Sequence, residues 1–154
     1  MPDVLAFAPQ GIALVNAAIF LDSLRYKFTD HPKTQEIFGR LDAWAGSHGA
    51  QGVFSRRGVF SQYVIGTAEL ATSVLMLVGA LVPSFSALMP LGAALSLALM
   101  SGAIGFHLFT PLGVDPNRDG GGLFRAACLV WLGSLFLVCV EAGEVIAFAR
   151  AALA

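Results

Sequence analysis

The sequence predicts an all-α membrane protein: an antiparallel bundle of four transmembrane helices with a short amphipathic helix in the first loop. Of its 154 residues, 56% are hydrophobic and 12% are charged, and the mean hydropathy is +0.75. A soluble domain carries about 25% charged residues, so most of this surface suits lipid better than water. A bilayer span needs about 20 residues, and a chain of this length holds four such spans in a single domain.

Four apolar stretches are separated by residues that favour turns. They cover residues 4–24, 59–82, 87–109 and 123–148. Pro83 follows the second stretch, and Pro111 with the Gly-rich run 115–122 follows the third. Because proline and glycine end helices and form turns, the second and third spans are expected to form a tight hairpin.

Small residues within the spans predict close contacts between helices. Gly92 with Ser96, and Ala98 with Gly102, are spaced four residues apart and therefore lie on one helix face. Such pairs allow two backbones to approach closely in a membrane.

The first connection is the only long one, and it predicts an amphipathic helix over residues 31–45. Asp30 is expected to cap this helix, with Pro32 in its first turn. The apolar residues of the segment recur on one face: Ile37, Phe38, Leu41, Trp44 and Ala45. The helix either lies on the membrane surface, with Trp44 at headgroup depth, or covers the end of the bundle.

The basic residues predict the orientation of the chain. The first connection and the third loop carry eight of them: Arg25, Lys27, Lys33, Arg40, Arg56, Arg57, Arg118 and Arg125. The opposite side has Arg150 alone. Because cytoplasmic loops carry an excess of Lys and Arg, both loops are expected in the cytoplasm and both termini outside.

Glu69 is the first candidate for a functional residue, because it lies near the middle of the second span. It shares one helix face with Gln62, Gly66 and Ser73, and this face is expected to point into the bundle. An ionised group at the centre of a membrane helix costs roughly 2.5 kcal/mol or more, so the carboxyl needs a cation or a neutral state. Glu69 is either a proton carrier or ligand contact, or one partner in a structural hydrogen bond.

Five further polar residues are expected at one depth near the cytoplasmic end: Asp22, Arg25, Lys27, His107 and Arg125. In the simpler interpretation, Asp22 and Arg25 neutralise each other and the cationic side chains extend to the headgroups. The alternative is a pocket for an anion or a quinone headgroup, with His107 relaying protons. With no second histidine inside the membrane, haem ligation by two histidines of this chain is excluded, and metal binding has no support.

The fourth span carries Glu141 and Glu144 on one face of its outer half. Glu141 is expected to face the bundle and Glu144 the outer interface. A discontinuous proton path is suggested by the depths of these residues. His107 and Asp22 come first, Glu69 follows, and Glu141 with Glu144 comes last.

Three short motifs carry a resemblance to a known family. They are Tyr-Lys-Phe-Thr at 26–29, Gly-x-x-Glu at 66–69 and Phe-His-Leu-Phe at 106–109. With the four spans, they resemble the DoxX-like superfamily of small bacterial inner-membrane proteins, and Lys-Phe-Thr followed by Glu is similar to its DUF417, or YkgB-like, branch. The long first loop and the lack of paired cysteines depart from that pattern.

The resemblance implies a setting rather than a reaction. Some members are subunits of membrane oxidoreductases such as thiosulfate:quinone oxidoreductase, and others are linked to oxidative or reactive-chlorine stress. It also implies that Glu69 and His107 match the polar residues that the family keeps inside the membrane.

Three functions follow as hypotheses. The first is an accessory or quinone-facing subunit of a membrane oxidoreductase complex or redox-stress system, with no cofactor of its own and with quinone or lipid at the cytoplasmic end. The second is a small transporter using Glu69 and the cytoplasmic charges, and the third is a structural or assembly subunit. The expected partners are the bilayer and other membrane subunits or further copies, not nucleic acid, because a net charge of −1 and a pI near 6.2 argue against a nucleic-acid-binding surface. An independent enzyme is not expected, since no nucleophile with a base and no phosphate loop is visible.

Overall fold

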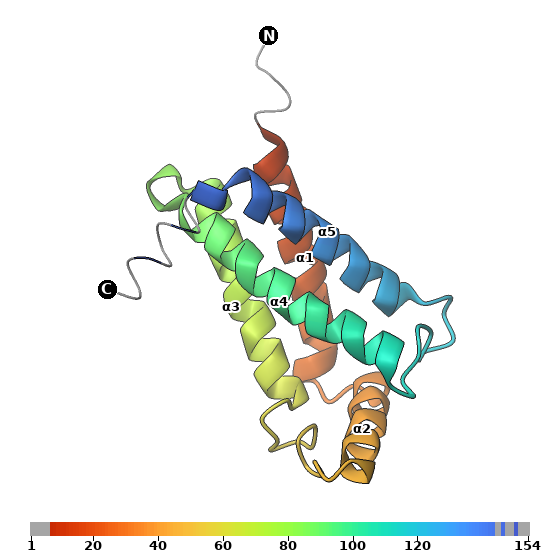
Figure 1. The fold of residues 1–154 in the computed structure, drawn as a ribbon. Helices are drawn as coiled ribbons and strands as arrows, with labels where there is room; N and C mark the ends of the chain where they lie inside the picture. The colour runs from red at the N-terminus through yellow and green to blue at the C-terminus, as the bar shows by residue number, and fades with distance from the viewer. Residues whose placement is uncertain (1–6, 144–145, 147–149, 151–154) are drawn as a thin grey trace.

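The computed structural model describes residues 7–143 together with residues 146 and 150. The described residues form helices and turns, with no β-strand among them. The elements are α1 (Ala8–Phe28), α2 (Pro32–Ser47), α3 (Gln62–Leu81), the short 3-10 helix η2 (Pro83–Phe85), α4 (Leu88–Phe109) and α5 (Gly122–Val140) (Figure 1).

The four long helices pack as an antiparallel bundle, and α2 lies at one end of it (Figure 1). α1 contacts α3 and α5, and α4 contacts the same two helices, so the order around the bundle is α1, α3, α4, α5. α1 and α4 run toward the α2 end, whereas α3 and α5 run away from it. The predicted all-α architecture is therefore confirmed.

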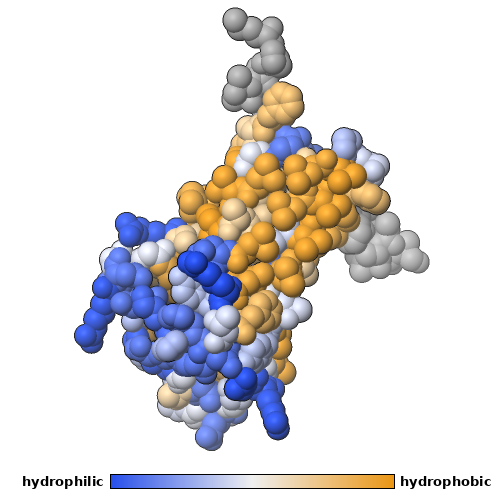
Figure 2. Space-filling view, turned by 180° about the vertical axis from the view of Figure 1, so that it is seen from behind, coloured by the Kyte–Doolittle hydropathy of each residue, from blue (hydrophilic) through white to orange (hydrophobic). Residues whose placement is uncertain are grey.

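Three helices in the described residues, α3, α4 and α5, are long and apolar enough to cross a membrane. α1 is 21 residues long but does not meet this hydropathy criterion. Its sequence includes Gln10, Asn16 and, near its C-terminal end, Asp22, Arg25 and Lys27. Figure 2 shows apolar residues gathered over the half of the molecule away from α2 and hydrophilic residues at the α2 end.

The helix limits differ from those expected mainly at α1 and α3. α1 continues to Phe28 rather than ending at residue 24, because no proline or glycine interrupts it there. α3 begins at Gln62 rather than at residue 59, and the Ser61 hydroxyl accepts the amide of Val64. α5 ends at Val140 and a turn follows at Glu141, whereas the expected limit at residue 148, like Glu144, lies outside the described part.

His31, not Asp30, caps α2. Its ring Nδ1 accepts the backbone amide of Lys33 at 3.3 Å. Asp30 adopts φ +54 and forms the turn between α1 and α2, which leaves its carboxylate free for other contacts. This left-handed conformation is uncommon, although Asp tolerates it better than most residues.

The apolar face of α2 packs on protein and covers the end of the bundle. Leu41 and Ala45 are buried against Phe54 and Leu112, and Phe106 of α4 joins this second hydrophobic cluster. Trp44 is half-buried, with its ring centroid 6.4 Å from that of Phe106. These contacts favour the end-covering role over a helix lying flat on lipid.

Small residues set the spacing of α3 and α4. A Cβ atom at Gly79 would lie 2.2 Å from the Met89 nitrogen, and one at Gly92 would lie 2.9 Å from Met76 Cγ. The expected close contact at Gly92 is thus confirmed. Ala98 and Gly102, expected to pack in the same way, are instead exposed on α4.

We expect Gly79→Ala to destabilise the bundle, because its methyl group would force α3 and α4 apart. Overpacking of this kind costs about 1–3 kcal/mol. Reversible unfolding in mixed micelles, followed by circular dichroism, measures the free energy of unfolding. Gly102→Ala is the matched control, since a Cβ atom there meets nothing within 4 Å. An equal loss in both variants would contradict the close contact.

Candidate functional site

A buried ion pair joins α1 to α3. Lys27 Nζ lies 2.9 Å from Glu69 Oε2, and the two side chains are 13% and 5% exposed. The face of α3 that was expected to point inward does so, since Gln62, Gly66, Glu69 and Ser73 are all buried. Lys27 is therefore the cation that a carboxylate at this position requires.

The side chains of Lys27 and Phe28 take the space beside Gly66 on α3, which places the Lys27 amine near Glu69. A Cβ atom at Gly66 would lie 3.3 Å from Phe28 Cζ and 3.4 Å from Lys27 Cδ. The Ser23 hydroxyl, one turn earlier on α1, donates to Glu69 Oε2 at 2.7 Å and accepts from Lys27 Nζ at 3.2 Å. The amine of Lys27, expected near headgroups, thus lies in a pocket made by α1 and α3.

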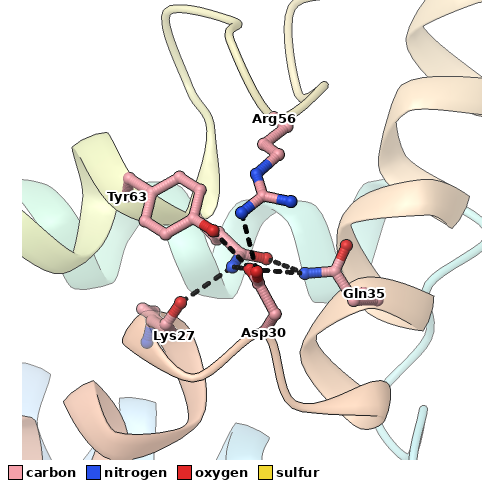
Figure 3. A network of polar contacts seen from close by, with 6 residues as sticks. Lys27, Asp30, Gln35, Arg56 and Tyr63 are labelled. Carbon is pink, nitrogen blue, oxygen red and sulfur yellow. Dashed lines mark hydrogen bonds and ion pairs between the residues drawn. The ribbon is translucent and has the colours of Figure 1, made fainter.

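Asp30 is the centre of a second polar cluster at the α2 end of the same helices (Figure 3). Its carboxylate accepts hydrogen bonds from the Tyr63 hydroxyl, from Gln62 Nε2 at 2.7 Å and from Gln35 Nε2 at 3.3 Å. Arg56 Nη2 lies 2.8 Å from its other oxygen. One carboxylate therefore connects the end of α1, α2, the α2–α3 connection and α3.

Gln62 links the Asp30 cluster to the buried ion pair. Its side-chain amide also donates to the backbone carbonyl of Lys27 at 2.7 Å, and its Oε1 accepts from Gln35 at 2.6 Å. We call the set Ser23, Lys27, Asp30, Gln35, Arg56, Gln62, Tyr63 and Glu69 the polar seam. It leads from Arg56, whose side chain is 70% exposed, to Glu69 in the interior.

The Asp30 carboxylate favours its charged form. The hydrogen bond from Tyr63 is the largest cause, and the charge of Arg56 and the amide of Gln62 act in the same direction, so the pKa of Asp30 lies below its ordinary value despite partial desolvation. A carboxylate held ionised in this way stays paired with the Arg56 guanidinium at the surface end of the polar seam.

An apolar groove of about 440 Å³ lies on α3 beside the polar seam. It is lined by Tyr63, Val64, Thr67, Ala68 and Ala71. Tyr63 belongs to both features, because its ring lines the groove and its hydroxyl bonds to Asp30. The groove is therefore a shallow, open apolar surface of α3, bordered at one end by Tyr63, whose hydroxyl donates to Asp30.

The other residues singled out from the sequence do not join the polar seam through a described contact. Asp22 and Arg25 form an ion pair of 3.1 Å with side chains 63% and 65% exposed, which is the mutual neutralisation expected in the simpler interpretation. His107 is buried, with Nδ1 2.6 Å from the Gly113 carbonyl oxygen and its ring against Phe124. Arg125 is exposed on α5.

Glu141 is half-buried at the C-terminal cap of α5, and Glu144 is not described. In the suggested path from His107 and Asp22 through Glu69 to Glu141, His107 contacts Gly113 and Asp22 contacts Arg25. No described contact joins either residue to Glu69. Within the described residues, no three His, Cys, Asp or Glu side chains lie together in a way that could hold a metal ion.

Asp30, Gln62 and Tyr63 were missed as a cluster by reasoning from the sequence. Asp30 was assigned to a helix cap, and its true partners come from residues 35, 56, 62 and 63. One signal was available: Ser23 and Lys27 are four residues apart and so share a face of α1. That face could have been matched to the face of Glu69.

No family model, curated protein or solved structure matches this chain. The functional argument therefore depends on the residues of the polar seam and the groove.

We expect Lys27→Met to destabilise the bundle by about 3–5 kcal/mol, because it leaves the Glu69 carboxylate buried without its cation. The double variant Lys27→Met/Glu69→Met should recover most of this loss, since neither charge remains. Unfolding in mixed micelles gives the coupling energy of the pair, and Lys33→Met, at an exposed lysine, is the control. Additive effects of the two single changes would rule out a coupled pair.

Stability should also depend on pH through Asp30. Its pKa in the folded chain is lowered, so its contribution is complete above the unfolded pKa of about 3.9 and is lost as pH falls through the folded pKa. We expect Asp30→Asn to be less stable than wild type at pH 7, with the difference shrinking below about pH 4. Melting curves from pH 7 to pH 3 measure this, with the exposed Asp22→Asn as control. A constant difference across that range would contradict the prediction.

Proposed function

We propose that this chain is a four-span protein of the DoxX-like superfamily that serves as a quinone-facing accessory subunit of a membrane oxidoreductase complex, with no cofactor of its own. In this proposal it lies in the bacterial inner membrane, with the α2 end in the cytoplasm and both termini outside. The observation that carries the proposal is the groove on α3, which begins at Tyr63 and so borders the polar seam.

Two features of α1 support its role as the fourth span. Its 21 residues extend about 32 Å, close to the roughly 30 Å hydrocarbon thickness of a bilayer. It packs against both α3 and α5, and its charged residues are confined to its last two turns. The apolar part, residues 8–21, extends only about 21 Å, so the charged last turns complete the span, and there Asp22 pairs with Arg25 and Lys27 with Glu69.

The contacts between loops support the orientation. Arg40 of α2 donates to the carbonyl oxygens of Pro111 and Leu112, at 2.7 Å and 3.2 Å, in the α4–α5 connection. The two basic connections therefore meet at one end of the bundle, which favours that end for the cytoplasm.

The positions of the family-like motifs support the resemblance. Lys27 belongs to the 26–29 motif and Glu69 to the 66–69 motif, and these two residues form the buried ion pair. Phe106, from the third motif, packs in the cluster under α2 at the same end. The first two motifs thus meet in the polar seam, and the third packs in the separate hydrophobic cluster under α2.

The chemistry of quinone reduction explains why such a subunit would be useful. Conversion of a quinone to a quinol takes up two electrons and two protons, and the hydrocarbon core supplies no protons. In this proposal a partner subunit supplies the electrons, the isoprenoid tail lies along the apolar groove, and the Tyr63 hydroxyl turns its single proton from Asp30 to a ring oxygen of the quinone. Asp30, which pairs with the exposed Arg56, connects that donor to the cytoplasmic surface.

The test is purification in a mild detergent followed by visible spectroscopy and a quinone-reduction assay. We expect a redox partner with haem or flavin bands, and at least about a tenfold loss of quinone reduction in Tyr63→Phe, as for removal of a proton donor. Tyr26→Phe is the matched control, because the Tyr26 hydroxyl bonds to the surface residue Arg25.

Two outcomes would count against this function. A homo-oligomer free of any redox partner, with solute flux through vesicles containing the chain alone, would favour the transporter. Normal quinone reduction in Tyr63→Phe would show that the groove takes no part in the reaction. The copurification result would then decide whether the chain is a subunit of a redox complex.

A further inference from the structure

A second cavity lies at the α2 end of the molecule and carries groups of both charges. Its volume is about 170 Å³, and it lies between α2 and the connection that leads to α3. Asp42 and Phe38 line it from α2, whereas Phe54 and Arg56 line it from the connection. Gln62, the first residue of α3, also borders it, so the cavity opens at the depth where a membrane span begins.

The two charges in this cavity do not neutralise each other. Asp42 Oδ1 accepts the backbone amide of Phe54 at 3.0 Å, and among the described residues Asp42 forms no ion pair. Arg56 directs one nitrogen to Asp30 and holds its guanidinium 5.4 Å from the centre of the Tyr63 ring. A carboxylate and a guanidinium thus line one small cavity, each with bonding capacity left.

The rest of the lining combines the polar side chains of Gln35, Ser55 and Gln62 with an aromatic part that is firmly held. Phe54 is 6% exposed, and its ring packs against Phe60 and Phe106 at centroid distances of 6.0 Å and 5.1 Å. Phe38 lies against the same hydrophobic cluster. Gly39 leaves the opening clear, because a Cβ atom there would meet nothing within 4 Å.

We propose that this cavity binds a small zwitterion, with an ammonium group at Asp42 and an anionic oxygen at Arg56. A purely anionic ligand would meet the Asp42 carboxylate and a purely cationic one the Arg56 guanidinium, whereas a short dipolar molecule pairs with both. The aromatic wall adds an apolar contact for the connecting carbons and attracts the ammonium. A cavity of about 150 Å³ holds benzene, so this one is large enough for a group of that size.

Two sources have this chemistry: the phosphoethanolamine headgroup of a membrane lipid, and a free amino acid of similar length. The proposal does not depend on the redox role, because it uses neither the groove nor the Lys27–Glu69 pair.

The test uses the full chain purified in a maltoside detergent, which carries no charge. Calorimetry with O-phosphoethanolamine and β-alanine measures binding of free zwitterions. Native mass spectrometry compares phosphatidylethanolamine with phosphatidylglycerol of the same acyl chains. Tighter binding of phosphatidylethanolamine alone identifies a lipid site, and saturation by the free zwitterions identifies a soluble ligand; either supports the proposal.

Two variants localise the binding. Gly39→Leu should fill the cavity and abolish it, and Asp42→Asn should weaken it about tenfold or more, because a charge-assisted hydrogen bond becomes a neutral one. Asp42→Asn keeps the acceptor for the Phe54 amide, so the fold is preserved. Glu36→Gln and Arg57→Gln, at exposed neighbouring charges, are the controls and should bind as wild type does.

Three results would overturn the proposal. They are absence of binding by every zwitterion tested, wild-type affinity in Gly39→Leu, and inorganic phosphate binding as tightly as O-phosphoethanolamine. The last would show that no ammonium group is recognised. Circular dichroism and melting curves of both variants establish that any loss of binding occurs in folded protein.

Discussion

A carboxylate inside an apolar helix bundle must have a partner, and this requirement fixes how α1 lies on α3. Lys27 meets Glu69 at 2.9 Å, and its side chain packs with that of Phe28 beside Gly66. A shift of α1 by one turn would bury one charge without the other, at a cost of several kcal/mol. The pair therefore sets the register of the two helices, and with it the position of Asp30, which begins the turn after α1.

The α2 end is built on a different principle from the rest of the bundle. It has its own hydrophobic cluster around Phe54 and Leu112, and Arg40 ties α2 to the α4–α5 connection. Such packing is typical of a protein in water, where apolar side chains are buried away from solvent. Its consequence for function is that Arg56 and Asp42 are held by a folded connection rather than by a loose loop.

Local patterns in the sequence were sufficient for the helices and for the inward face of α3, because hydropathy and helical spacing are properties of one segment. The gathering of the basic connections at one end was also predictable, and the contacts of Arg40 agree with it. The partners of Glu69 and Asp30 were not, because each lies on another element and depends on how α1 meets α3. Asp30 resembled a helix cap by position, but the His31 ring supplies that cap and the backbone of Asp30 turns with φ +54.

A comparison with the middle of the bundle indicates what the ion pair is for. There, Asn16 donates to Ser134 at 3.1 Å and Ser134 to Ser96 at 2.7 Å, so that three helices are joined by uncharged groups, all buried. Neutral hydrogen bonds of this kind specify helix contacts without the desolvation cost of charges. These neutral contacts join α1, α4 and α5, whereas Lys27 and Glu69 join α1 to α3. The charged pair therefore holds the one bundle helix that the neutral network does not reach, and Gln62 ties the Lys27 backbone at that contact to Asp30, which also accepts from Tyr63.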